Sequence, residues 1–213
     1  MAGDVQLSLL GRTAAFPVAV PLVREPYGGA SDLAALAQAI ENCHGCRLRM
    51  GATRVVPGEG NPQARLMLVG EGPGQQEDLT GRPFVGAAGQ LLERMLAAIG
   101  LSREDTYIAN VVKCRPPGNR VPADDEAAAC LPYVLTQIQL VNPEVVLLLG
   151  ATATRALVGK SLAITKVRGQ WFERDGRLYL PTYHPAALLR DPSKKREAWE
   201  DLKQVRDYLG LPT

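Results

Sequence analysis

The sequence predicts an α/β fold in which helices cover both faces of a parallel sheet. Short apolar runs at residues 64–70 and 143–150 have the length and composition of strands buried on both sides. Segments with apolar residues at helical spacing lie between such runs. Because strands that alternate with helices pair in parallel within one sheet, we expect three layers, with ligands bound at the carboxyl ends of the strands.

The composition is that of one globular domain of ordinary size. The chain has 213 residues, of which 46% are hydrophobic and 22% charged. No apolar run approaches the ~18 residues that a membrane span needs, and the start of the chain lacks the pattern of a secretory signal. We therefore expect an intracellular protein without membrane contact. The net charge of +2 permits a local basic surface for nucleic acid without requiring one.

The first elements of the chain are an arm and a capped helix. Residues 1–30 contain Gly and Pro without a sustained period, so we expect an extended arm before a single domain over residues 31–213. Ser31 is expected to cap the first helix, and Pro132 to kink or break a later one because it has no N–H to donate. The predicted elements of this half, in order, are a helix over 31–42, a strand over 64–70, a helix over 89–100, a strand over 106–113 and a helix over 122–141.

The second half continues the alternation. The most apolar strand candidate, over 143–150, is followed by a short helix that Gly159 closes. A hairpin is expected to turn at Asp175 and Gly176 and to lead into the last core strand. A helix over 196–210 then completes the fold.

The first strand ends in a glycine-rich turn, "GEGPGQQED", at residues 70–78. The glycine spacing is not that of a dinucleotide-binding turn, and Pro73 removes an N–H that would bind phosphate. No Lys-Ser/Thr pair follows, as a P-loop requires. A tight connection explains the glycines but not the acidic residues gathered beside them, Glu71, Glu77 and Asp78.

Three further side chains lie at strand ends or in a glycine-rich loop. Asn110 carries both donors and an acceptor, His184 can donate to an oxygen that gains negative charge, and Phe84 can stack on a ring. Each also has a structural alternative: a loop cap for Asn110, a loop hydrogen bond for His184 and a plug on the core for Phe84. Taken together with a carboxylate, the set suits recognition of a planar base.

The four cysteines are candidates for a metal site. Cys43 and Cys46 form a C-x-x-C pair, Cys114 follows a strand and Cys130 lies within a helix. A reducing compartment disfavours disulfides, so Zn²⁺ and a [4Fe–4S] cluster are the stronger interpretations. The spacing does not choose between them, and four unrelated buried cysteines remain an alternative.

At this point the motifs "GEGPGQQED", "GRPFVG", "NVVKCRPPGNR", "LLLGATA" and "HPAALLR" resemble those of the family 4 uracil-DNA glycosylases, which carry an iron–sulfur cluster. The resemblance covers residues 41–209. It implies a three-layer α/β/α fold with a central four-stranded parallel sheet, and a pocket for a uracil rotated out of single- or double-stranded DNA. It also implies a cytoplasmic, nucleoid-associated monomer, with residues 1–30 a candidate for binding a partner such as a sliding clamp.

The resemblance implies roles for the residues at the strand ends. Phe84 matches the aromatic that stacks on uracil, Asn110 the amide that reads its O4 and N3 edge, and His184 the donor to its O2. Glu71 and Gly72 match the first active-site motif. Gly72 stands where other uracil glycosylases have an aspartate, so the group that activates water is less obvious here.

Glu77 matches a further carboxylate near the pocket, and either it or Glu71 is expected to orient water or to offset the charge of a cationic sugar. The resemblance also favours a [4Fe–4S] cluster, with Cys43, Cys46, Cys114 and Cys130 as ligands.

Residues around the pocket are expected to contact DNA. Lys113, Arg115 and Arg120 are candidates for phosphate contacts, with a solvated loop as the alternative. Thr152 lies at a helix start that can offer N–H and hydroxyl groups to phosphate. Leu188 or Leu189 is expected to enter the gap left by the extruded base, and Arg190 follows them.

Two other functions compete with base excision. A relative that captures uracil-DNA without turnover would carry a longer, histidine-containing loop after Cys114, which this sequence lacks. A nucleotide-metabolising protein would need a phosphate motif, which is also missing.

Overall fold

The computed structural model describes residues 27–212, and these build one sheet of six strands in the order β1-β3-β2-β4-β6-β5. The four central strands are parallel, with Leu68 of β2 in register between Ile108 of β3 and Leu147 of β4. Their bounds are β2 Leu66–Gly70, β3 Thr106–Asn110, β4 Val145–Leu149 and β6 Arg177–Thr182. The predicted four-stranded parallel core is confirmed, and two short antiparallel strands, β1 Glu59–Gly60 and β5 Phe172–Arg174, extend its edges.

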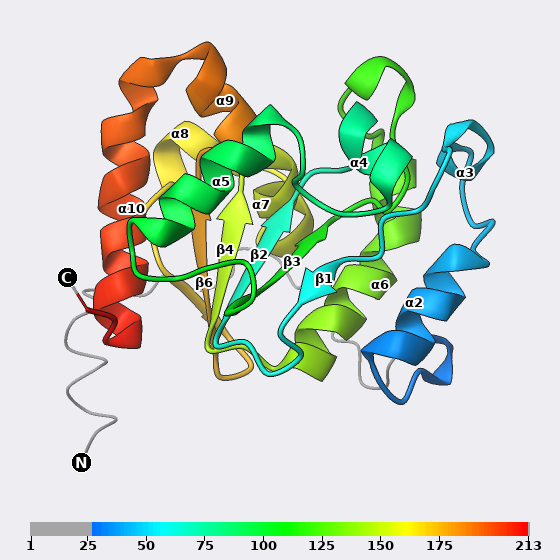
Figure 1. Ribbon diagram of the computed structural model, residues 1–213, viewed down its shortest axis with the longest axis horizontal. Helices are drawn as coiled ribbons and strands as arrows, with labels where there is room; N and C mark the ends of the chain where they lie inside the picture. The colour runs from blue at the N-terminus through cyan, green and yellow to red at the C-terminus, as the bar shows by residue number, and fades with distance from the viewer. Residues whose placement is uncertain (1–26, 213) are drawn as a thin grey trace.

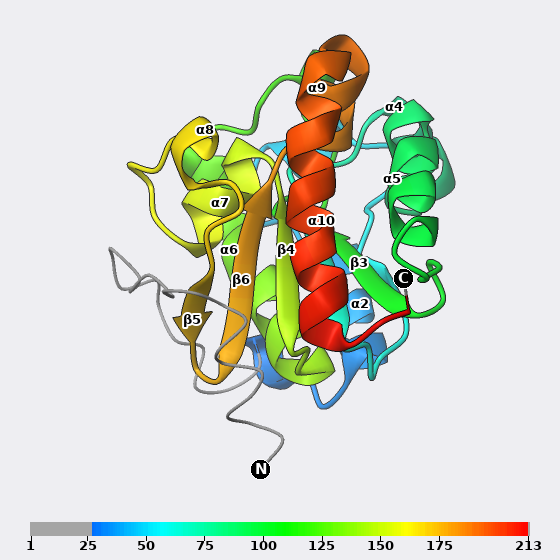
Figure 2. The ribbon, with the colours of Figure 1, turned by 90° about the vertical axis from the view of Figure 1, so that its left-hand side faces the viewer.

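Helices cover both faces of the sheet, as the alternating sequence predicts (Figures 1 and 2). Helices α5 (Ala87–Ala97) and α10 (Lys195–Leu209) lie on one face, and α6 (Asp124–Val141) and α7 (Ala151–Leu157) on the other. Helix α2 (Leu33–Glu41) packs on the outside of α6. The result is a three-layer α/β/α arrangement.

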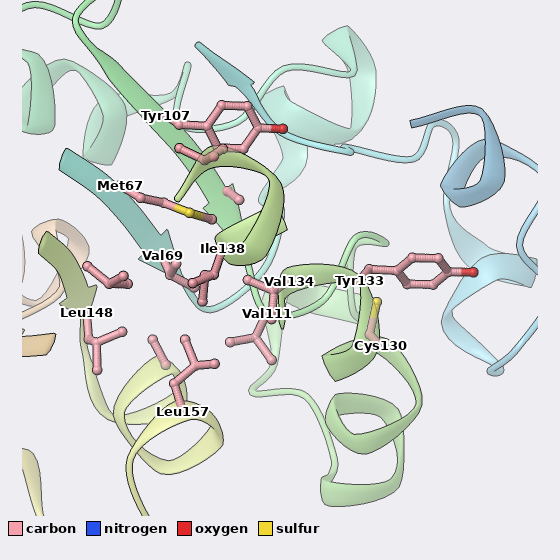
Figure 3. Packing of buried hydrophobic residues seen from close by; sticks show 14 of the residues in the cluster. Met67, Val69, Tyr107, Val111, Cys130, Tyr133, Val134, Ile138, Leu148 and Leu157 are labelled. Carbon is pink, nitrogen blue, oxygen red and sulfur yellow. The ribbon is translucent and has the colours of Figure 1, made fainter. Parts of the chain in front are cut away.

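Successive strand residues serve the two cores in turn. Leu66 and Leu68 join the core under α5 and α10, whereas Met67 and Val69 join the core under α6 and α7. All four side chains are at most 1% exposed. Figure 3 shows the second core, which extends from the sheet along α6 as far as Cys130. Burial on both faces is the reason why these strands read as continuous apolar runs.

Two local predictions differ from the structure. Helix α6 is not broken at Pro132, so packing against the sheet outweighs the missing hydrogen bond, while the alternative of a kink there stays a prediction. The cap of α2 is Asp32 rather than Ser31: the Asp32 carboxylate accepts a hydrogen bond from the Ala35 N–H at 2.8 Å. The hairpin between β5 and β6 turns at Asp175 and Gly176, as predicted, with positive φ angles of 52° and 71°.

Several short helices were not predicted, because segments of four to six residues carry little periodicity. The most important is α9, which carries Leu188, Leu189 and Arg190, the residues expected at the gap left by the base. The short helices are α3 Leu48–Gly51, α4 Gln75–Thr80, α8 Ile164–Val167, α9 Pro185–Arg190 and the 3₁₀ turns Tyr27–Gly29, Pro117–Asn119 and Pro192–Lys194.

The predicted N-terminal arm, with its candidate clamp contact, lies outside the described residues up to residue 26. Its last residues pack against the domain: Tyr27 makes an edge-to-face contact with Tyr133 of α6, with ring centroids 4.9 Å apart. Among residues 27–212, no helix is both long enough and apolar enough to span a bilayer.

Candidate functional site

A cavity of about 510 Å³ opens at the carboxyl ends of the four parallel strands. This is the edge of the sheet near α4 and α9 in Figure 1. Each central strand contributes to it, through Glu71 after β2, Asn110 at the end of β3, Gly150 after β4 and His184 after β6. The predicted site residues that line it are Glu71, Gly72, Glu77, Phe84, Asn110, Arg120, His184 and Arg190. The volume is typical of a pocket for a small ligand.

Asn110 is the most deeply buried polar group of this cavity. Its side chain is 2% exposed, and its Oδ1 atom is buried without a hydrogen-bond partner among the described residues. A buried acceptor left unpaired costs about 1–3 kcal/mol, so such an atom is expected where a ligand completes the bonding. The main-chain oxygen of Asn110 is held in place by the Lys113 ammonium group at 2.8 Å.

Phe84 lies beside Asn110 and faces His184. The two rings are stacked, with centroids 5.5 Å apart and planes inclined by 30°. Gly70, at the end of β2, makes room for this arrangement. A Cβ atom at Gly70 would lie 2.5 Å from both the Phe84 Cζ and the Asn110 Oδ1 atoms.

His184 caps helix α9 through its ring. The Nδ1 atom accepts a hydrogen bond from the Ala186 N–H at 3.1 Å, which places the proton of the neutral imidazole on Nε2. Burial lowers the pKa of His184 to about 4; the nearby Arg190 charge adds to this, and Glu77 opposes it. Near neutral pH the site therefore holds an uncharged imidazole with one N–H to donate.

Glu71 and Gly72 follow β2 directly. The Thr152 hydroxyl, at the start of α7, donates a short hydrogen bond to the Glu71 carboxylate, which fixes the direction of that side chain. Thr152 does not itself line the cavity. A Cβ atom at Gly72 would lie 2.6 Å from Val112 Cγ2, so the fold leaves no space for a longer residue at this position.

Glu77 binds main chain rather than pointing freely into the cavity. Its two oxygens accept hydrogen bonds from the N–H groups of Gly74, Val85 and Gly86 at 3.1, 2.9 and 2.9 Å. The side chain is buried, and these bonds tie α4 to the loop that carries Phe84. The geometry favours a structural role over the predicted catalytic one, which stays a prediction.

Two of the predicted DNA-contact residues are buried in this structure, which disfavours these contacts, and both stay predictions. Lys113 is 1% exposed, and its ammonium group donates to the Asn110 main-chain oxygen and to Gln137 Oε1 at 2.5 Å. Leu188 is 2% exposed and belongs to the core under α5 and α10. Leu189, which the sequence offered as the alternative, is 41% exposed.

The two arginines of the loop after Cys114 are accessible but have partners within the protein. Arg115 donates to Asn119 Oδ1 at 2.7 Å. Arg120 lines the cavity and forms two hydrogen bonds with Glu126, at 2.8 and 2.7 Å. The Glu126 side chain is completely buried, and Arg120, followed by Arg47, lowers its pKa to about 2. The sequence analysis did not predict that Glu126 pairs with Arg120 and Arg47. Its position in the acidic first turn of α6 was the feature that could have indicated this role.

The four cysteines line a second, small cavity of about 20 Å³. Cys114 and Cys130 are buried, and all four are free thiols. Burial, with the neighbouring thiols adding to it, raises the pKa of Cys114 to about 12; burial likewise raises that of Cys130 to about 11. Within residues 27–212, no three His, Cys, Asp or Glu side chains are arranged to hold a single metal ion.

The wall of this cysteine cavity also contains an unpaired donor. The Nε atom of Arg49 is buried without a hydrogen-bond partner among the described residues. The cavity therefore offers four sulfur ligands and one free N–H. Four thiols at one cavity are the donor set of a structural zinc site or of an iron–sulfur cluster, and the free N–H could bond to a sulfur atom of either.

Comparison with known proteins agrees with the geometry. The pattern described as the Uracil DNA glycosylase superfamily matches residues 57–203. A type-4 uracil-DNA glycosylase of Thermotoga maritima is 47% identical over 180 residues, which cover 82% of this chain and 93% of the relative. One of Sulfurisphaera tokodaii is 44% identical over 190 residues, covering 85% and 86%. The chain belongs to the type-4 uracil-DNA glycosylase family.

The resemblance stated from the motifs is thus confirmed, as is the fold that it implies. A type-5 uracil-DNA glycosylase of Pyrobaculum aerophilum is more distant, at 35% identity over 153 residues that cover 63% of this chain and 67% of the relative. In this type-4 chain, contact with Val112 gives a steric reason for glycine at position 72.

Proposed function

We propose that this type-4 uracil-DNA glycosylase takes a uracil nucleotide out of DNA and hydrolyses the bond between base and sugar, leaving an abasic site. One observation carries the proposal. The unpaired Oδ1 atom of Asn110 lies in the same cavity as the stacked rings of Phe84 and His184. A planar base that offers an N–H beside a carbonyl oxygen would complete the bonding of the amide while its ring contacts Phe84.

Asn110 accounts for the choice of base. Its Oδ1 would accept the N3–H of uracil, and its amide N–H₂ would donate to O4. Cytosine has an unprotonated N3 and an N4–H₂ group, so an amide in the same orientation would face an acceptor with its oxygen and a donor with its N–H₂. A buried amide left mispaired in this way is the kind of contact that discriminates strongly between otherwise similar substrates.

His184 supports departure of the base. As the C1′–N1 bond breaks, its electron pair passes to the uracil ring, and negative charge develops on O2. The Nε2–H group of neutral His184 would donate to that oxygen, and such a donor is worth about 3–4 kcal/mol by analogy with oxyanion holes. A water molecule then adds to C1′ and gives up a proton to solvent, and the departed uracil anion takes up one proton, so the products are an abasic sugar and neutral uracil. Glu71, held by Thr152, is the better placed carboxylate to orient this water or to offset the cationic sugar, because the oxygens of Glu77 already accept three N–H groups.

The accessible rim of the cavity supports contact with the DNA backbone. Arg120 and Arg190 line it and Arg115 lies on the adjoining loop, which provides positive charge for phosphates. Leu189 is an exposed apolar side chain beside Arg190 of this rim, and we assign it the place of the extruded base in the stack. Single- and double-stranded DNA remain alternative substrates, and we propose that the protein acts as a cytoplasmic, nucleoid-associated monomer.

We further propose that Cys43, Cys46, Cys114 and Cys130 hold a [4Fe–4S] cluster. The support is their common cavity and its free Arg49 N–H. The cluster would be structural, joining the segment after α2 to the loop after β3 and to α6. Protein purified without oxygen should be brown and contain four irons and four sulfides for each chain. Colourless protein with one zinc at full occupancy would refute the assignment.

The function is tested by base release from oligonucleotides that carry uracil, thymine, hypoxanthine or cytosine opposite each base. We expect release of uracil with multiple turnovers, and loss of that release in Asn110→Ala and His184→Ala. The matched control is His44→Ala, because His44 is the other histidine of the chain and is exposed outside the cavity. Full single-turnover activity in both pocket variants would show that the chemistry occurs elsewhere.

A further inference from the structure

The main chain at Phe84 has an unusual conformation. Its φ angle is +52°, in the left-handed region, which is unfavourable for a residue with a Cβ atom. The other non-glycine residues with positive φ in the described part of the chain are Asn119, Asn142 and Asp175. Asn and Asp tolerate this region, whereas a bulky aromatic does not, so the surroundings must hold Phe84 in place.

The guanidinium group of Arg103 supplies part of that restraint. Arg103 lies in the connection between α5 and β3, and its side chain is 12% exposed. Its Nη1 donates to the main-chain oxygen of Phe84 at 2.8 Å, and its Nη2 to that of Pro83 at 2.6 Å. Glu59 of β1 accepts from the same Nη2 at 2.5 Å, so the charge of this partly buried arginine is paired.

The other side of Phe84 is held by Glu77. Its carboxylate accepts from the N–H groups of Val85 and Gly86. Gly89 allows the close approach, since a Cβ atom there would lie 1.8 Å from the Phe84 oxygen. Four consecutive residues, 83 to 86, therefore each give one main-chain group to a charged side chain.

We infer that Arg103 is a positioning residue for base excision, one that holds the ring of Phe84 in the base-binding cavity before DNA arrives. Arg103 does not line that cavity, so it acts through Phe84 and not by contact with the substrate. The inference rests on the proposed function of Phe84 as the surface on which uracil stacks. It predicts that Arg103 affects the rate of base release far more than it affects DNA binding.

The chain offers a matched control in Arg82. Arg82 also pairs with Glu59, at 2.8 and 3.0 Å, but its side chain is 61% exposed, and it donates no hydrogen bond to residue 83 or 84 among the contacts described. Arg103→Met and Arg82→Met each remove one arginine from Glu59. Only the first removes the bonds to the main chain of Phe84.

We expect Arg103→Met to lower the single-turnover rate on uracil-DNA about 10- to 100-fold, the range for reacting groups misplaced by up to 1 Å. The DNA affinity of Arg103→Met should stay within about twofold of that of the unsubstituted protein. The single-turnover rate of Arg82→Met should also stay within about twofold of the unsubstituted rate, because an exposed ion pair contributes little energy. In a Phe84→Ala background, Arg103→Met should change the rate less than about threefold, because two residues that act as a unit are not additive. An equal loss in both backgrounds, or an unchanged rate with only a lower melting temperature, would overturn the inference.

A measurement without substrate separates this inference from the proposed function. Hydrogen exchange at the amides of Val85 and Gly86 should become faster in Arg103→Met and remain unchanged in Arg82→Met. Unchanged exchange in both variants contradicts the positioning role even if uracil is released. If Arg103→Met does not fold, Arg103→Lys takes its place. The folded Arg103→Lys protein is expected to release uracil more slowly than the unsubstituted protein, and an equal rate would count against the inference. Failure of the unsubstituted chain to release uracil refutes the proposed function instead.

Discussion

Gly70 is the position at which one methyl group should disable the proposed base-binding cavity. In Gly70→Ala, the added Cβ atom would lie 2.5 Å from the Phe84 Cζ atom and 2.5 Å from the Asn110 Oδ1 atom. Ordinary contacts begin near 3.4 Å, so each neighbour must move by about 1 Å. Both side chains are buried, and the main chain of Phe84 is held by Arg103 and Glu77, which leaves little freedom to adjust.

The size of the effect follows from two separate costs. Overpacking of this kind destabilises a protein by about 1–3 kcal/mol, which for a domain of this size lowers the melting temperature by about 2–12 °C. A shift of about 1 Å in groups that contact the substrate reduces the rate about 100-fold. We therefore expect a folded protein with a strongly reduced rate.

The assay is single-turnover release of uracil at a temperature where the variant is folded, combined with thermal unfolding. The control is Gly51→Ala at the end of α3, where a Cβ atom meets nothing within 4 Å and φ is not positive. The control should keep both its rate and its melting temperature. If Gly70→Ala released uracil as fast as the unsubstituted protein, Phe84 and Asn110 would not be the groups that hold the base.

Three further outcomes are expected. Thr152→Val, which removes the hydroxyl bound to Glu71, should lower the single-turnover rate about 10-fold, the worth of one hydrogen bond to a charged group, whereas Thr152→Ser should retain most of it. Since Glu126 has a pKa of about 2 in the folded protein against 4.5 ordinarily, its stabilising contribution is present above pH 4.5 and lost as pH falls toward 2. In Glu126→Gln, denaturant titration should give a lower free energy of unfolding near neutral pH and a weaker decrease of that free energy below pH 4.5. An unchanged dependence on pH would contradict the stabilising pairing of Glu126 with Arg120 and Arg47. For His184, nitrogen NMR should show a neutral ring with its proton on Nε2 and a titration near pH 4. Because the pKa is lower in the folded protein than in the unfolded chain, the free energy of unfolding should decrease as pH falls from 6.5 toward 4. A titration near pH 6.5 would refute the buried, neutral donor.

The parallel sheet was predictable from sequence because its strands are buried on both faces. Leu66 to Gly70 and Val145 to Leu149 are completely buried in the structure, and that is the origin of their continuous apolar character. The edge strand β5 was predicted as the first arm of the hairpin, whereas β1 was not predicted, since two residues at an edge carry no periodic signal.

The cavity was predictable in outline for a different reason. Asn110 and His184 are polar residues at the ends of apolar strands, and the topology of a parallel sheet brings such ends together. Burial of individual long side chains was not predictable: Lys113 looks like a DNA contact beside Arg115, but its ammonium group turns inward to Asn110 and Gln137. Tertiary contacts of this kind leave no local pattern in the sequence.

The short stretch between Asn110 and Cys114 belongs to two sites at once. Asn110 lines the proposed base-binding cavity and Cys114 lines the cysteine cavity. Val112, between them, lines the cysteine cavity and lies against Gly72 in the glycine-rich turn of the other cavity. Inserting or deleting a single residue here would turn both the amide and the thiol away from their partners. Chain length should therefore vary less across the family in this stretch than in the connection before β6, where the two arms of a surface hairpin can lengthen together without disturbing either cavity.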